Sequence, residues 1–119
     1  MSGSALIELQ IDSATEVEVR ARLPVTDALK QPLGVVHGGV YAVIADALTA
    51  GDGRVITSQT SFLRPAVSGT LSAVARRRHG GRTTAVWEVD VLDDAGRLCA
   101  VVRTTIARGR PQPPAPGAP

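Results

Sequence analysis

Hydrophobic and polar residues alternate along much of the chain. From Thr15 to Leu23 every second residue is apolar, with Glu and Arg between. A period of two is typical of a β-strand that buries one face. Leu6–Ile11 alternates in the same way. The pattern therefore predicts one or two half-buried strands at the start of the chain.

The alternation is interrupted by an apolar run of helical length. Val40–Ala50 contains no Pro or Gly and is apolar on nearly every helical face. We expect a helix from Gly38 to Ala50, stopped by Gly51-Asp52-Gly53, after a loop over Pro24–Val36. A helix that is hydrophobic all round is normally buried, so this helix is expected at the centre of the fold.

Four strand-like runs follow the helix: Arg54–Leu63, Thr70–His79, Arg82–Leu92 and Arg97–Ala107. Gly80-Gly81 predicts a two-residue hairpin turn with positive φ at both glycines, and Asp93–Gly96 predicts a tight turn. Short joints favour antiparallel neighbours, so we expect an antiparallel meander. The predicted fold class is α+β, with a curved antiparallel sheet wrapped around one long central helix.

Composition limits the class of protein. The 119 residues are enough for one domain, and 44% hydrophobic with 20% charged residues is typical of a soluble globular protein. A net charge of +2 is too small to indicate nucleic acid, and the single Cys99 fits a reducing compartment. Neither a secretory signal nor a membrane-length apolar stretch is visible, so we expect a cytoplasmic protein. Residues 5–109 should form the domain and 110–119 a disordered Pro-rich tail.

One carboxylate, Asp46, lies within the apolar helix. A buried charge is costly unless it is paired or kept for chemistry. Asp46 is therefore either a structural acid, bonded to a hydroxyl or an arginine, or a nucleophile or general base. Gly38 and Gly39 open the same helix, where free N–H groups can hold an oxyanion. Alternatively, these glycines only permit a tight entry into the helix.

The spacing of these residues has a consequence for assembly. Gly38 and Asp46 are eight residues apart, which is about 12 Å along a helix. One carbonyl group cannot reach both within a single chain. If both act on the same bond, the protein is a homodimer with two composite sites.

Two neighbouring side chains are weaker candidates. His37 either contacts a substrate or fixes the loop, and the Gln31 amide is able to donate to a carbonyl oxygen. No cofactor is predicted, because His37, His79 and Cys99 lack metal-ligand spacing and no phosphate loop or dinucleotide fingerprint occurs.

A basic cluster, Arg76–Arg82, runs through a predicted hairpin tip. It has three interpretations: a nucleic-acid contact, an edge strand protected by charge, or recognition of a phosphorylated carrier at the mouth of a site, with Arg82 as a contact. Strand alternation would divide the arginines between two faces, and no aromatic residues are interleaved with them, which counts against nucleic acid.

The segment Gln31–Ala42, followed by Asp46, resembles the hotdog-fold acyl-CoA thioesterases, in the branch of the phenylacetate-degradation and 4-hydroxybenzoyl-CoA enzymes. Phe62–Ala66, Gly81-Arg82 and Asp94–Arg97 also match segments of that family. The resemblance extends from about Thr15 to Arg108. It implies a sheet wrapped around a central helix, a dimer with a continuous sheet, and often a tetramer.

The resemblance also implies roles by position. The Gly38 N–H would polarise a thioester carbonyl, Asp46 of the partner subunit would be the catalytic carboxylate, and Gln31 would contact the thioester. His37 would orient the loop or the substrate. Further substrate-binding positions are Gly39, Thr49, Ser58 and Arg82. Some relatives hold the water with a Thr or Ser where this chain has Ala50. Thr49 is adjacent but points elsewhere on the helix, so Ser58 from the next strand would have to substitute.

The predicted reaction is hydrolysis of an acyl-CoA to free acid and CoA, without a cofactor, by a homodimer or homotetramer that binds neither nucleic acid nor membrane. Two alternatives remain: an enzyme that releases or edits acyl chains on a carrier protein, and a non-catalytic acyl-CoA-binding module. The acyl group and the choice between nucleophile and base are open.

Overall fold

The computed structural model describes residues 8–108. The predicted tail and the segment Met1–Ser4 lie outside this range. The elements, in chain order, are β1 (Gln10–Ala14), β2 (Glu18–Pro24), η2 (Asp27–Leu29), α1 (Gly38–Thr49), η3 (Ala50–Asp52), β3 (Gly53–Phe62), β4 (Thr70–Gly80), β5 (Thr84–Leu92) and β6 (Leu98–Arg108).

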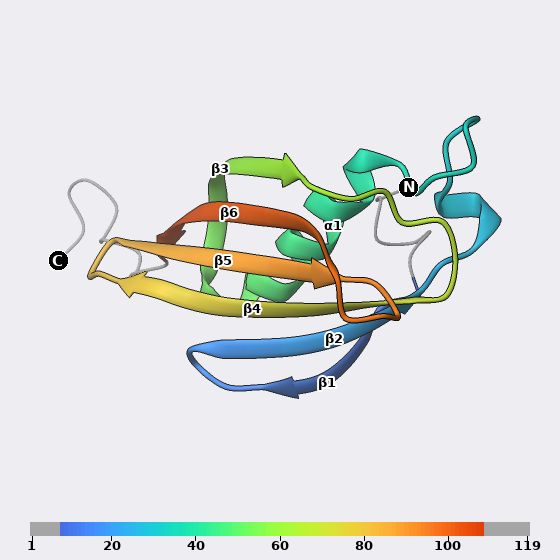
Figure 1. Cartoon of the computed structure of the whole chain (residues 1–119). Coiled ribbons are helices and arrows are strands. Elements are labelled where there is room, and N and C mark those ends of the chain that lie inside the picture. Colours follow the sequence, from blue (N-terminus) through green and yellow to red (C-terminus); the bar gives the residue numbers. More distant parts are fainter. Residues whose placement is uncertain (1–7, 109–119) are drawn as a thin grey trace, which may run out of the picture.

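The strands form one six-stranded antiparallel sheet in the order β1-β2-β4-β5-β6-β3. The sheet curves around α1, which packs against β2 to β6 (Figure 1). Helix residues Ile44 and Ala45 are fully buried, as are Val89 and Val102 on the inner face of the sheet. The predicted α+β fold, a sheet around one central helix, is confirmed.

The beginning of the sheet differs from the prediction. The first strand lies at Gln10–Ala14, and only residues 8–11 of the predicted run Leu6–Ile11 are within the described part of the chain; the second strand begins only at Glu18. Thr15 explains the shift, because its hydroxyl oxygen accepts hydrogen bonds from the N–H groups of Val17 and Glu18. A side chain that bonds the backbone in this way competes with the strand ladder and makes a turn. Val17 is consequently 51% exposed.

The predicted meander is wrong for β3. This strand pairs with β6 and not with its neighbour in sequence, β4. The linker over residues 63–69 is long enough to cross to the other side of the sheet. It is held there by hydrogen bonds from Val36 N to Ala66 O (2.7 Å) and from Val25 N to Gly69 O (2.8 Å). As a result β3 is an edge strand with one side unpaired within residues 8–108.

The two hairpin turns also differ from each other. Gly96 has a φ of 77°, as the predicted tight turn requires. Gly80 and Gly81, in contrast, have no positive φ, and the β4–β5 joint spans residues 81–83. Gly80 leaves room for Arg77, because a Cβ there would lie 2.9 Å from the Arg77 guanidinium.

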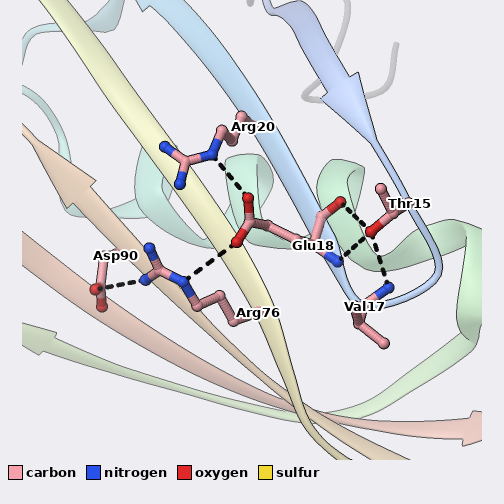
Figure 2. A network of polar contacts seen from close by, with 6 residues as sticks. All are labelled: Thr15, Val17, Glu18, Arg20, Arg76 and Asp90. Atoms are coloured by element: carbon pink, nitrogen blue, oxygen red, sulfur yellow. Dashed lines mark hydrogen bonds and ion pairs between the residues drawn. The ribbon is translucent and has the colours of Figure 1, made fainter.

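The basic cluster is divided between the two faces of β4. On the outer face Arg76 lies 3.5 Å from Glu18 and 3.7 Å from Asp90 (Figure 2). Arg78 pairs in the same way with Glu88, at 3.2 Å. These arginines are therefore neutralised by acids from neighbouring strands. The edge-strand interpretation is wrong, because β4 lies inside the sheet between β2 and β5.

Gly53, at the junction of η3 and β3, allows a test of the packing. Its φ is 144°, and a Cβ would collide with the carbonyl oxygen of Ala107. Gly53→Ala is expected to lower the free energy of unfolding by about 2–3 kcal/mol. Gly51→Ala is the matched control, because nothing lies within 4 Å of its Cβ position. Urea unfolding of both variants measures the difference, and equal stabilities would contradict the expectation.

Candidate active site

His37 is the N-cap of α1. Its Nδ1 accepts a hydrogen bond from the Gly39 N–H at 3.0 Å, and its own N–H donates to Leu29 O at 2.8 Å. This arrangement satisfies one of the free donors at the helix start. The Gly38 N–H, in contrast, has no acceptor among residues 8–108. The His37 cap thus binds the Gly39 N–H and leaves the Gly38 N–H available to a ligand.

Gln31 lies at the start of a tight loop that leads to His37. Its N–H donates to Val35 O at 2.8 Å, and its carbonyl accepts from the Gly34 N–H at 2.9 Å. Gly34 has a φ of 82°, which favours glycine at this position. The loop therefore carries Gln31, His37 and Gly38 in one compact unit at the N-terminal end of α1.

Phe62, at the end of β3, completes this end of the site and was not predicted as a site residue. A Cβ on Gly38 would lie 2.9 Å from its ring, so a larger residue at this position would push the ring aside. The ring centroid is 6.1 Å from that of Tyr41, and the Phe62 side chain remains 64% exposed. A sequence signal existed, because Phe62 is the only phenylalanine of the chain and lies in a segment that matches the thioesterases.

Asp46 is exposed in the single chain, which corrects the expectation of a buried acid. It shares the uncovered face of α1 with small apolar residues, among them Ala42, Val43 and Ala50. Partial desolvation raises the pKa of its carboxyl above the usual value. Asp46 has no hydrogen bond or ion pair with any described residue, so the structural-acid interpretation has no partner in residues 8–108.

The remaining predicted residues do not gather at this site. Thr49 is buried, and its hydroxyl donates to Ala45 O at 2.8 Å. Ser58 is exposed on β3, opposite Thr104 of β6. Arg82 lies in the β4–β5 joint, at the other end of the molecule from the start of α1 (Figure 1). Ala50 is exposed beside the end of the helix.

Within residues 8–108, no three His, Cys, Asp or Glu side chains lie close enough together to hold a metal ion. In the same part of the chain, no helix has the length and hydrophobicity required to cross a bilayer.

The capping role of His37 predicts a specific pair of variants. His37→Ala is expected to lower the free energy of unfolding by about 1 kcal/mol, because the Gly39 N–H loses its acceptor. His37→Asn should restore stability and most of the activity, because Asn is a good N-cap. Urea unfolding and turnover are measured together. A stable but inactive Asn variant would mean that His37 contacts the substrate directly.

Comparisons with known proteins agree with this geometry. Residues 33–100, more than half of the chain, match the thioesterase superfamily. The 1,4-dihydroxy-2-naphthoyl-CoA hydrolase of Escherichia coli is 28% identical over 85% of this chain and 82% of its own. The proofreading thioesterase EntH of Klebsiella pneumoniae is 32% identical over 71% and 69%. The solved structure of Escherichia coli PaaI, from the phenylacetic acid degradation operon, superimposes with a TM-score of 0.82, at 25% identity over 90% of this chain and 83% of its own. The chain therefore belongs to the thioesterase superfamily, and it is a thioester hydrolase with the hotdog fold.

Proposed function

We propose that the protein hydrolyses an acyl-CoA to the free acid and CoA in a site shared by two subunits. The Gly38 N–H of one subunit polarises the thioester carbonyl, and Asp46 of the partner subunit supplies the carboxylate. The proposal rests on the hydrogen bonding of these two groups. The donor and the carboxylate both lack a partner within residues 8–108, yet they lie about 12 Å apart on one helix.

The chemistry follows from these positions. As a general base, Asp46 removes a proton from the water that attacks the carbonyl carbon; as a nucleophile, it forms an anhydride that water then hydrolyses. In both cases the C–S bond breaks and the CoA thiol leaves. The Gly38 N–H and the positive end of α1 stabilise the oxyanion. The raised pKa of the Asp46 carboxyl makes it a stronger base than an ordinary aspartate.

A homodimer through β3 would bring the two halves of the site together. The strand has ten residues, one of its edges is unpaired within residues 8–108, and the exposed Ile56 and Phe62 lie on it. An edge of this length is a template for pairing with another strand. Pairing two β3 strands would continue the sheet and face the uncovered sides of the two α1 helices toward each other. Light scattering of the purified protein measures whether the dimer forms and whether dimers pair further into tetramers.

The relatives suggest which substrates to assay first. One is named a hydrolase of an aromatic acyl-CoA, so aromatic acyl-CoAs head the panel, followed by short and medium aliphatic ones. The second candidate function, release of acyl chains from a carrier protein, is supported by the relative named a proofreading thioesterase. Release of free thiol from each CoA ester and from the same acyl group on a carrier protein separates the two.

Mixing two inactive variants tests the shared site directly. Asp46→Asn and Gly38→Pro proteins are unfolded together, refolded and assayed. In a statistical mixture half of the dimers are mixed, and each mixed dimer has one site with both groups intact. About a quarter of the wild-type activity should return. A protein that is monomeric under assay conditions, or a mixture that recovers nothing, would contradict the proposal.

A further inference from the structure

A groove of about 590 Å³ lies at the C-terminal end of α1, away from Gly38. It is bordered by the end of the helix, the β1–β2 turn and residues of β4, β5 and β6. Ile11, Val19 and Leu48 give it apolar walls, together with the ring of Trp87. Its volume is in the range of sites that bind small molecules.

The polar end of the groove is built around Asp52. Its Oδ2 accepts a hydrogen bond from Trp87 Nε1 at 2.7 Å, and its Oδ1 lies 3.2 Å from Arg108 Nη2. The other terminal nitrogen of Arg108 donates to Gly81 O at 2.8 Å. Asp52 and Arg108 therefore have close partners of their own.

Arg77 is different. Its side chain is only 18% exposed, but its one ion pair, with Asp52, is long at 3.9 Å. No hydrogen bond from its guanidinium to any other residue is found within residues 8–108. Gly80 leaves space for this group, since a Cβ there would lie 2.9 Å from it. A largely buried guanidinium with five donors requires acceptors, and Arg77 borders the groove.

We propose that the groove binds a small monocarboxylic acid with an apolar body. The carboxylate would accept two parallel hydrogen bonds from the Arg77 guanidinium, the usual geometry of an arginine–carboxylate pair. The apolar body would lie along Leu48 and the Trp87 ring. Glu16, which lines the groove from the β1–β2 turn, adds a negative charge that disfavours a doubly charged group such as a phosphate.

This site is separate from the thioester site. Ala47 lines the groove, while Asp46 is one residue earlier and therefore points about 100° away around the helix. Gly38 is at the opposite end of α1. The inference consequently does not depend on the proposed roles of Asp46 and Gly38.

Trp87 supplies the readout, because it is the only tryptophan and forms one wall of the groove. Sodium octanoate should change its fluorescence in a saturable way, and 1-octanol, which has the same body without the charge, should bind at least about tenfold more weakly. Arg77→Gln should weaken octanoate binding by about tenfold or more, with Arg77→Lys as a second variant if the first does not fold. Glu16→Gln should strengthen octanoate binding, because it removes a negative charge from the groove.

Two controls keep the proposal open to refutation. Arg20→Gln changes an exposed arginine on the outer face of the sheet and should leave binding unchanged. Asp46→Asn should also bind octanoate normally. A response that is not saturable, that is equal for octanol, or that survives in the Arg77 variants would overturn the assignment. Loss of binding in Asp46→Asn would overturn it as well, because the ligand would then occupy the thioester site.

Discussion

Asp46→Asn is expected to lower kcat by about 10²–10⁴-fold, the usual contribution of a positioned base, without loss of the fold. The amide has the size of the carboxylate but neither accepts a proton nor attacks a carbonyl at neutral pH. Because Asp46 has no partner within residues 8–108, its replacement breaks no contact there. Thiol release from the best acyl-CoA measures the effect, and circular dichroism checks the fold.

The same variant should be more stable than the wild type at neutral pH. Desolvation raises the pKa of Asp46 in the folded chain, so the folded state binds more protons than the unfolded state between the two pKa values. The free energy of unfolding therefore falls as the pH rises through this window. Above the folded pKa, the folded state bears the full cost of an ionised, partly desolvated Asp46. In thermal melts at neutral pH, Asp46→Asn should have a higher melting temperature than the wild type. The difference in melting temperature should become smaller as the pH approaches about 4, the pKa of aspartate in an unfolded chain.

The matched control is Asp27→Asn, in a fully exposed side chain of η2 that forms a 3.5 Å ion pair with Lys30. It should retain wild-type turnover and stability. The wild-type pH profile gives a further check, because the acid limb of kcat/KM should lie above the usual range for aspartate. Wild-type turnover in Asp46→Asn would assign this residue a structural role.

The alternation of residues predicted most of the sheet, and the failures have physical causes. In β2 the buried Val19, Ala21 and Leu23 are on the predicted face. The position of β3 was missed because pairing with β6 is decided by the seven-residue linker and by long-range packing, which local pattern does not contain. Val17 was misplaced because the Thr15 side chain diverts the backbone into a turn.

The prediction of a fully buried helix failed for a different reason. The sequence of α1 is apolar nearly all round, but within one chain the face that carries Asp46 is uncovered. We interpret this hydrophobicity as a property of the assembly, since the small residues of that face fit close contact with another helix. Asp46 is exposed in the single chain, and only the dimer that we propose would bury it.

Part of the site could also be predicted from the sequence. Gln31, His37 and Gly38 lie in one short segment, so their proximity follows from local structure. Phe62 reaches Gly38 only through the fold of β3 against α1, which no spacing reveals. Arg77 has a local signal in the sequence, because it follows Leu71, Ala73 and Ala75 in the inward alternation of β4, where an arginine is out of place.

Gly38→Pro should lower kcat by about 10²–10³-fold, as expected when one oxyanion donor is removed. Gly38 is the first residue of α1, a position where proline fits a helix and lacks only the N–H. His37 before it has φ −64° and ψ 134°, a conformation allowed ahead of proline. The variant should therefore fold while it loses the proposed donor.

Gly38→Ala is the control that distinguishes loss of the Gly38 N–H from the steric effect of a Cβ at this position. Both variants add a Cβ at 2.9 Å from the Phe62 ring, which is exposed and can move, but alanine keeps the N–H. We expect alanine to retain at least about tenfold more activity than proline, because the oxyanion contact remains. Equal losses would mean that glycine serves the close approach of Phe62 and that the oxyanion is held elsewhere. A much larger loss for proline, with both variants equally stable in urea, assigns the polarising contact to the Gly38 N–H.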